Sequence, residues 1–196
     1  MNYTDVIYRE IEPRELVPDS RELSARLGGG CLALSGEECL SEIYEIMRPR
    51  YSAARVKIAE GECGVFIDGI LVESRGLYKN LSGADEAFLI AVTLGSEVDA
   101  YLYRLGMLSG AGRFAADAVA SALAEALMEL ADKELSAGLS CSPRFSPGYG
   151  DFSLEYQRTL LCRVNAEGLL GIRLTDASFM IPSKSITAIM GIKCNV

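Results

Sequence analysis

Histidine and tryptophan are absent from this sequence of 196 residues, and the missing histidine excludes several kinds of active site. Ser-His-Asp and Cys-His nucleophile systems, histidine-containing zinc sites and imidazole acid–base catalysis all require a side chain that the chain does not have. Any chemistry must therefore use carboxylates, lysine, tyrosine or cysteine, or a reactive group that a bound ligand brings.

Cysteine pairs with the spacing of metal ligands are also absent. The six cysteines never form a C-x-x-C pair, which excludes a zinc knuckle and a thioredoxin-like motif. The first five residues lack the basic and apolar regions of a secretion signal, and the longest strongly apolar stretch, residues 87–94, is far too short to span a membrane. We therefore expect a cytoplasmic protein with reduced, partly buried thiols and no membrane partner. The cysteines are Cys31, Cys39, Cys63, Cys141, Cys162 and Cys194.

Positive charge is scarce: 19 Lys and Arg residues stand against 27 Asp and Glu residues, and the net charge is −8. An acidic surface without a basic tract repels phosphate backbones, so we expect no nucleic-acid partner. With 49% hydrophobic residues the composition is that of a globular protein. A chain of this length buries about 70% of its unfolded surface, which suits one domain.

Hydrophobic periodicity predicts strands near both ends of the chain and helices mainly between them, an order that favours an α+β fold. Glycines 28–30 are expected to stop the first helix, and residues 35–38 (S-G-E-E) have the spacing of a capping box that begins the second. Asp68-Gly69 is expected to form a hairpin turn. We expect helices at about residues 20–27, 39–47, 96–105, 113–135 and 154–164, and strands within 53–72 and at 87–94, 172–175, 179–181 and 186–192.

The helix expected at residues 113–135 is the longest periodic segment and is rich in alanine. Small side chains let another backbone or a ligand approach the helix axis closely. Polar residues recur every four positions and form one stripe along this helix. A solvated helix face and a ligand-facing edge are both compatible with this pattern. The members of this polar stripe are Asp117, Ser121, Glu125 and Glu129.

Residues 110–115 read G-A-G-R-F-A, which fits the G-x-G-x-x-A fingerprint of dinucleotide-binding proteins. That fingerprint functions only after a β-strand, with an acidic residue at the end of the following strand. Here the preceding segment is itself helical, and Asp132 lies within the same long helix. The sequence therefore predicts a simple helix–helix turn at this place.

Residues 140–152 contain two prolines, two glycines and several serines, which predicts a loop. Proline makes such a loop rigid, and glycine permits close approach of a backbone. Arg144 offers a planar donor group for a carboxylate or phosphate, and Tyr149 offers an aromatic face and a hydroxyl. On these residues alone, a structural turn and a ligand-binding loop are both possible.

Residues 144–151 read R-F-S-P-G-Y-G-D and resemble the R-x-S-P-G-Y-G-D loop of the activation domain of cobalamin-dependent methionine synthase, especially its small stand-alone relatives. Three further stretches are similar to the same family: residues 87–99 to its central strand and turn, 117–126 to its long helix, and 172–191 to its closing segment. The resemblance covers about residues 45–192, in order. It implies a bent antiparallel sheet flanked by helices at residues 45–196, on which an N-terminal segment, residues 1–44, packs within one domain.

In that family the domain binds S-adenosylmethionine and serves reactivation. When the cobalamin is oxidised to cob(II)alamin, an electron from flavodoxin and a methyl group from S-adenosylmethionine restore methylcobalamin. The resemblance therefore implies a reactivation module that acts on a separate methionine synthase or related corrinoid protein. Cobalamin would be carried by that partner, and flavodoxin or ferredoxin would donate the electron. The protein would supply position and electrostatics, which suits a chain without histidine.

The resemblance also assigns roles to particular residues. Arg144 would take the ligand carboxylate with two hydrogen bonds. Glu125 is the family-matching acid on the long helix, and its charge would face the ammonium or the sulfonium. Backbone groups of Ser146, Gly148 and Tyr149 would read the edge of the adenine.

Two other functions stay open from the sequence. One is a docking or chaperone module for a corrinoid protein that transfers no methyl group, which is favoured because a further tyrosine of the family's ligand groove has no counterpart here. The complete 144–151 loop argues for ligand binding instead. The other is an S-adenosylmethionine-binding enzyme unrelated to cobalamin, for which no specific residue speaks.

Overall fold

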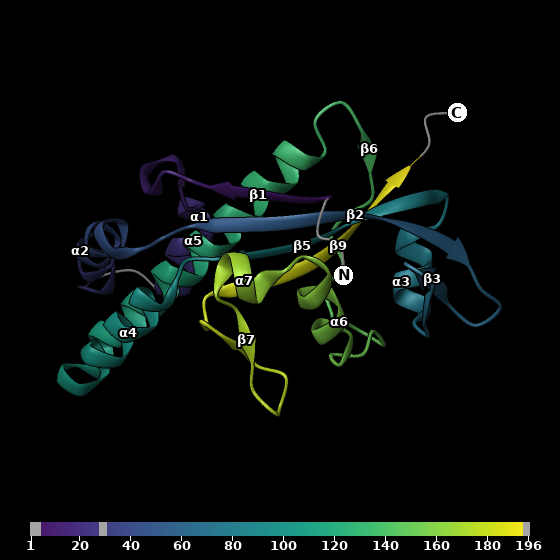
Figure 1. Cartoon of the computed structure of the whole chain (residues 1–196). Coiled ribbons are helices and arrows are strands. Elements are labelled where there is room, and N and C mark those ends of the chain that lie inside the picture. Colours follow the sequence, from purple (N-terminus) through teal and green to yellow (C-terminus); the bar gives the residue numbers. More distant parts are fainter. Residues whose placement is uncertain (1–4, 28–30, 194–196) are drawn as a thin grey trace.

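The computed structural model describes residues 5–27 and 31–193, and a seven-stranded antiparallel sheet organises them (Figure 1). The strands are β1 (Val6–Glu10), β2 (Arg50–Glu60), β3 (Val65–Ile67), β4 (Ile70–Val72), β5 (Ala84–Thr93), β6 (Ser140–Cys141) and β9 (Ser185–Lys193). Their order is β4-β3-β2-β5-β9-β6, and β1 pairs with the first half of β2 along the edge that β3 occupies further on. A separate hairpin joins β7 (Arg173–Leu174) and β8 (Met180–Ile181).

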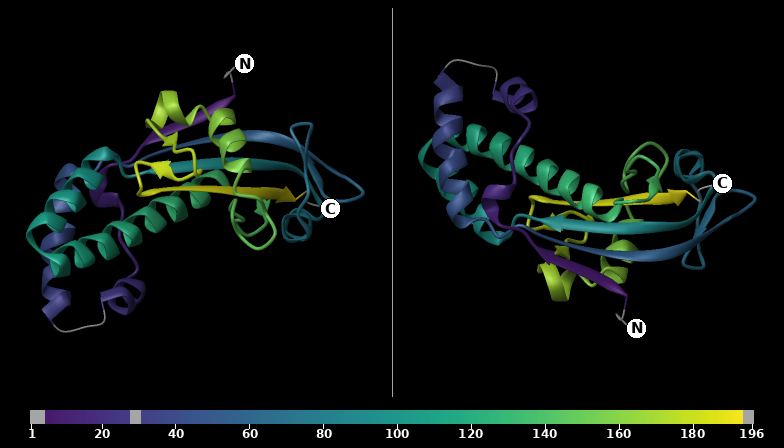
Figure 2. Two further views of the ribbon diagram at one scale, coloured as in Figure 1. Left: turned by 90° about the horizontal axis from the view of Figure 1, so that it is seen from below. Right: turned by 90° about the horizontal axis from the view of Figure 1, so that it is seen from above.

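Helices cover both faces of this sheet. One core lies under α1 (Ser20–Leu27), α2 (Cys31–Ile46), α4 (Ser96–Leu108) and α5 (Gly110–Leu135), and the 3₁₀ helix η1 (Pro13–Glu15) connects β1 to this side. A second core lies under α3 (Arg75–Leu81), α6 (Tyr156–Arg163) and α7 (Ala166–Leu170). Figure 2 shows β2, β5 and β9 side by side along the length of the molecule, with α5 crossing one face.

The central strand β5 is buried on both sides, as its apolar run predicted. Phe88 and Ile90 belong to the core beneath α5, whereas Leu89 and Ala91 belong to the core beneath α6 and α7. Alternating side chains point to opposite faces of a strand, so a strand covered on both faces needs apolar residues at every position. The mixed α/β fold with an antiparallel sheet flanked by helices is therefore confirmed in a single domain.

Residues of the N-terminal segment contribute to the first of these cores. Ile11, Leu16 and Leu27 are almost completely buried, and Ile43 has no exposed surface. They pack in the same cluster as Leu123 of α5. This part of the chain therefore shares its core with the rest of the molecule.

Helix α5 is the long helix that the periodicity predicted, and most of its alanines are buried. Ser109 ends α4 and begins α5, because its Oγ accepts a hydrogen bond from the Gly112 N–H at 3.0 Å. The turn at residues 110–115 therefore connects two helices, as predicted, and no strand precedes it. The buried alanines of α5 are Ala115, Ala116, Ala118, Ala120, Ala122, Ala124 and Ala131.

Several elements differ from the sequence expectations. Strand β1 and the short helices α3 and α7 were not predicted, and the capping box at residues 35–38 is wrong because α2 already begins at Cys31. Gly36 is an interior position of α2, where an added Cβ would lie 2.7 Å from Leu27 Cδ1, so glycine serves the close packing of α1 there. The predicted turn at Asp68-Gly69 is confirmed, with positive φ at both residues. The expected glycine stop at residues 28–30, and Cys194, lie outside the described residues.

Within the described ranges, no helix is both long enough and apolar enough to cross a membrane.

The alanine packing of α5 generates a stability prediction. Ala120 has no exposed surface, so Ala120→Leu should overpack the core and lower the free energy of unfolding by about 1–3 kcal/mol. Ala111 is exposed in the first turn of the same helix, and Ala111→Leu should change stability by less than about 0.5 kcal/mol. Urea unfolding measures both. Equal stability of the two variants would mean that the core around α5 expands freely, against this packing.

Candidate functional site

A cavity of about 380 Å³ lies where the 144–149 loop, α5 and the first half of β9 meet. That volume is in the range of small-molecule sites. Strand β6 and the loop pair with β9 only as far as Ile189, so the cavity lies beside the portion of β9 that follows Lys184. The lining residues are Glu125, Met128, Arg144, Phe145, Ser146, Pro147, Tyr149, Gln157, Met180, Ser185, Ile186, Thr187 and Ala188.

The loop is attached to the sheet at its start. The Phe145 N–H donates to the Ile189 carbonyl at 2.9 Å, and the Ile189 N–H donates back to the Phe145 carbonyl at 2.8 Å. Just before it, the Ser142 N–H donates to the Gly191 carbonyl, and the Gly191 N–H donates to Ser142 Oγ at 2.9 Å. These bonds fix the backbone on either side of Arg144.

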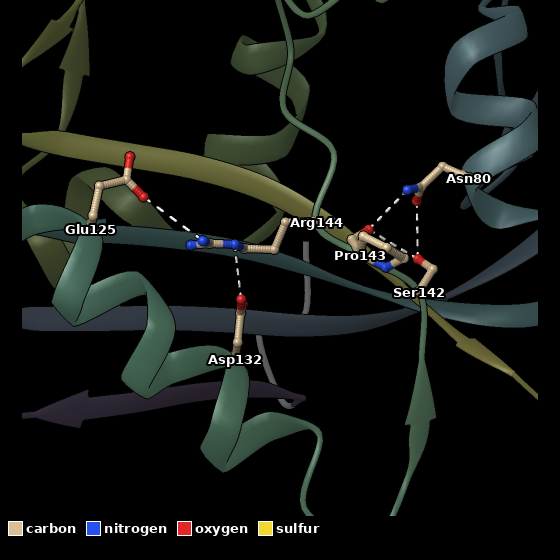
Figure 3. Close-up of polar contacts among 6 residues, drawn as sticks. All are labelled: Asn80, Glu125, Asp132, Ser142, Pro143 and Arg144. Carbon is tan, nitrogen blue, oxygen red and sulfur yellow. Dashed lines mark hydrogen bonds and ion pairs between the residues drawn. The ribbon is translucent and has the colours of Figure 1, made fainter. Parts of the chain in front are cut away.

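Helix α3 holds the same stretch from the other side (Figure 3). Asn80 Nδ2 donates to the Pro143 carbonyl at 2.9 Å, and Ser142 Oγ donates to Asn80 Oδ1 at 3.0 Å. The sequence expectations assigned no role to Asn80, because α3 itself was not predicted. The segment just before Arg144 therefore has hydrogen-bond partners on both β9 and α3.

The middle of the loop is a tight turn that glycine makes possible. The Gly148 N–H donates to the Phe152 carbonyl at 2.8 Å, and the Tyr149 N–H donates to the Ser146 carbonyl at 3.1 Å. Gly148 has φ of +90°, a conformation that other residues rarely adopt. The Phe145 and Phe152 rings stack with centroids 6.1 Å apart, which closes the turn over an apolar base.

The end of the loop is bonded to the first turn of α3. Asp151 Oδ1 accepts from Ser74 Oγ at 2.6 Å and from the Gly76 N–H at 3.1 Å, and Oδ2 accepts from the Arg75 N–H at 2.7 Å. These hydrogen bonds stabilise the ionised carboxylate and lower the pKa of Asp151 to about 2. The carboxylate is therefore charged, and connects the loop to α3, throughout the neutral pH range.

Arg144 extends from the loop to α5 and lies between two carboxylates of that helix (Figure 3). Its Nε is 2.9 Å from Asp132 Oδ2, and its Nη2 is 3.8 Å from Glu125 Oε2. Glu125 and Asp132 are about two helical turns apart, so they share one face of α5. The arginine side chain is 28% exposed, which leaves it accessible from the cavity.

Asp132 occupies a desolvated position. Burial is the main cause that raises its pKa to about 6, and the negative charges of Glu129 and Glu125 raise the pKa as well. The positive charge of Arg144 lowers the pKa, but by less than burial raises it. Its Oδ1 is buried and has no hydrogen-bond partner within the described part of the chain. The same carboxylate, together with burial, raises the pKa of the Cys141 thiol on β6.

The polar stripe of α5 contacts the neighbouring segments. Lys184 Nζ lies 2.9 Å from Asp117 Oδ1 and donates to Ser121 Oγ at 2.9 Å, which fastens the start of β9 to α5. Glu125 faces Arg144 and the cavity, and Glu129 is exposed. Only part of the stripe is therefore a solvated helix face.

Four of the five predicted site residues line this cavity: Glu125, Arg144, Ser146 and Tyr149. Gly148 forms the turn behind them and does not line it.

Sequence reasoning missed Asp132, which it considered only as part of the dinucleotide fingerprint. It also gave no role to the buried Gln157, whose Nε2 donates to the Ser178 carbonyl at 2.9 Å. An uncharged polar residue inside an otherwise apolar helix face was the available signal for Gln157.

A larger hollow of about 780 Å³ lies between η1 and the end of α2. None of the predicted site residues lines it, and two of its charged groups pair with each other, Arg14 Nη2 with Glu45 Oε1 at 2.8 Å. Across residues 5–27 and 31–193, no group of three or more Cys, Asp or Glu side chains is placed to hold a metal ion. The cavity beside Arg144 is therefore the candidate site.

The position of Asp132 generates a pH prediction. A carboxyl whose pKa is raised in the folded state stabilises the protein below about pH 4, and this contribution is lost as the pH rises through about 6. Carbon-13 NMR titration should give Asp132 a midpoint near 6. In Arg144→Ala the midpoint should move upward, because the arginine charge is what lowers it. A midpoint near 4 in the wild type, or a fall in the variant, would contradict this assignment.

Comparison with known proteins supports the fold that the sequence resemblance implies. The sequence matches no family model and no curated protein. Among solved structures, the chain is similar to the crystal structure of the MetH reactivation domain bound to AdoHcy, with a TM-score of 0.71 and 16% sequence identity over 97% of this chain and 79% of that chain. The likeness confirms the activation-domain-like fold that the sequence predicted: this chain has the fold of the MetH reactivation domain.

Proposed function

We propose that this protein binds S-adenosylmethionine in the cavity beside Arg144 and supports reductive methylation of cob(II)alamin on a separate cobalamin-dependent methionine synthase or related corrinoid protein. The observation that carries the proposal is that Arg144 and Glu125, with opposite charges, line one cavity under a fixed loop. The fold of a domain solved with AdoHcy supports the same ligand class.

The charges of the ligand match the charges of the wall. The Nη groups of Arg144 suit the ligand carboxylate, since two parallel N–H donors fit its two oxygens. Glu125 suits the ammonium or the sulfonium, because a fixed negative charge favours a cation nearby. A ligand with separated positive and negative groups therefore fits this wall better than a simple anion does.

The adenine would lie along the loop. The N–H groups of Gly148 and Tyr149 already donate within the turn, so these residues would meet the base through carbonyl oxygens, which keep a second lone pair. The Tyr149 side chain is 70% exposed at the rim and offers a ring for stacking. Gly148 and Tyr149 would therefore meet the ligand through acceptor and stacking contacts, whereas Ser146 keeps the backbone role that the resemblance implies.

The reactive groups belong to the ligand and the partner. The sulfonium supplies the methyl group, the partner carries the cobalamin, and a flavodoxin or ferredoxin supplies the electron. This chain binds and orients the sulfonium and presents it to the partner. The cytoplasm is the expected compartment, and Cys39, Cys63 and Cys141 are outside disulfide bonds, as in a reducing environment.

A docking module that transfers no methyl group is the second candidate. It is favoured by one observation: the guanidinium of Arg144 is already partly neutralised by Asp132, at 2.9 Å, without any ligand. An arginine satisfied within its own chain can serve to hold the loop in shape for a protein partner.

Calorimetric titration with S-adenosylmethionine tests the ligand. The wild type should bind it one to one, and Arg144→Ala should weaken binding by about 10- to 100-fold, since a charged hydrogen-bond partner is lost. Arg163→Ala is the matched control, because this arginine has similar exposure, pairs with Asp68 at 2.8 Å and does not line the cavity. Folded wild-type protein that gives no heat up to millimolar ligand would contradict the binding proposal.

A reactivation assay separates the two candidates. Added protein, S-adenosylmethionine and reduced flavodoxin should restore turnover to a methionine synthase that is loaded with cob(II)alamin and lacks its own activation domain. Arg144→Ala should restore much less at subsaturating ligand. Stable association with the synthase without any recovery of turnover would favour the docking function instead.

A further inference from the structure

Asp132 lies behind the arginine of the proposed site and does not form part of the cavity wall. Its Oδ2 takes the Nε side of Arg144 at 2.9 Å, whereas Glu125 lies 3.8 Å from Nη2 on the cavity side. Figure 3 shows the guanidinium extended between the two carboxylates. The two acids therefore contact different nitrogens of one side chain.

We propose that Asp132 is a positioning residue: by its contact with Nε of Arg144, it keeps the terminal nitrogens available to a ligand carboxylate and beyond hydrogen-bond distance of Glu125. This inference rests on the proposed binding of S-adenosylmethionine. It assigns a role to a residue that touches no ligand and acts only through Arg144.

The number of donors on the guanidinium makes this hold useful. Arginine has five N–H donors in one plane, and the ion-pair contact with Asp132 lies at Nε, which carries only one of them. The two terminal nitrogens keep their donors, and a carboxylate can accept from both end-on. Asp132 therefore fixes the plane without occupying the end that the ligand needs.

Without the contact to Asp132, Glu125 would compete with the ligand carboxylate for the terminal nitrogens of Arg144. At 3.8 Å from Nη2 it is beyond hydrogen-bond distance but within ion-pair distance. An Arg144 side chain released from Asp132 is free to close on Glu125, and that internal pair would occupy the donors for the carboxylate and the acid for the cation together. The contact between Asp132 and Nε of Arg144 therefore keeps both Arg144 and Glu125 available to a ligand.

The surroundings of Asp132 make the contact mutual. The carboxylate is 23% exposed and faces Glu125 and Glu129 of its own helix and Cys141 of β6. Among the described residues, the favourable charge beside it is that of Arg144. A desolvated carboxylate with acidic neighbours is stabilised by a cation held close to it. Arg144 is therefore held at this place by a partner that itself depends on the pair.

The charge of Asp132 acts in the opposite direction to the placement that its contact gives Arg144. The negative charge disfavours a ligand carboxylate on the far side of Arg144, whereas the ion-pair contact at Nε favours it by keeping the side chain in place. Asp132→Asn removes the charge and keeps an oxygen beside Nε, whereas Asp132→Ala removes both. The two variants therefore separate positioning from electrostatics.

The experiment is calorimetry with S-adenosylmethionine and with decarboxylated S-adenosylmethionine, which lacks only the carboxylate. Asp132→Ala should bind S-adenosylmethionine about tenfold more weakly than the wild type, and Asp132→Asn should bind it at least as well as the wild type. In Asp132→Ala the decarboxylated ligand should lose less affinity than S-adenosylmethionine does, because it forfeits only the contact with Glu125 and not one with Arg144. In an Arg144→Ala background the effect of Asp132→Ala should vanish.

Asp132→Glu provides a second route if Asp132→Ala does not fold. It keeps the charge but moves the carboxylate by one methylene, so it should displace the guanidinium and weaken binding of S-adenosylmethionine more than binding of the decarboxylated ligand. Thermal unfolding of each variant accompanies the titrations.

The remaining outcomes overturn the inference. Equal loss of both ligands, or a loss that persists without Arg144, would mean a merely structural role. Asp132→Ala binding as tightly as the wild type would mean that Asp132 does not position the arginine. If Arg144→Ala weakens binding while Asp132→Ala does not, this inference alone fails. If the wild type binds neither ligand, the proposed function fails and this inference with it.

Discussion

The pairing of Phe145 with Ile189 is the contact on which the site depends. Two backbone hydrogen bonds, 2.9 and 2.8 Å long, continue the edge of the sheet into a segment that has no further strand character. They orient the residue just before them, Arg144, so that its side chain reaches α5. Where this residue pair forms therefore determines how Arg144 meets the two acids of α5 and where the loop borders the cavity.

Most of the fold was predictable because its main elements carry strong local patterns. The apolar run of β5 and the alanine-rich period of α5 each predict one element type, and the turn at Asp68-Gly69 needs positive φ, which these residue types tolerate. Strand β1 was missed because five residues with charged outward positions become a strand only by pairing with β2, far away in the sequence. Gly36 contributed to the wrong predicted start of α2, because glycine at this interior position allows the close packing of α1 and does not mark the beginning of a helix.

The residues of the site also differ in whether the sequence could predict them. The loop residues were predictable from their composition and their family resemblance, since proline, glycine and arginine in that order limit the shapes available. Asp132 was not, because on a helix it is one polar residue among several, and only the folded loop brings Arg144 within 2.9 Å. Gly148 forms the turn of the loop with a positive φ and does not line the cavity, so its predicted contact with the ligand stays a prediction.

Asp151 joins the far end of the loop to α3, and this has a consequence for how the cavity responds to a ligand. A segment held by the sheet at one end and by a helix at the other has little conformational freedom left to lose. Little binding free energy is then consumed in ordering the loop, so affinity reflects the fit of the ligand itself. The same rigidity makes α3 part of the site's scaffold: a change in its first turn would shift the cavity wall, although α3 itself contributes no lining residue.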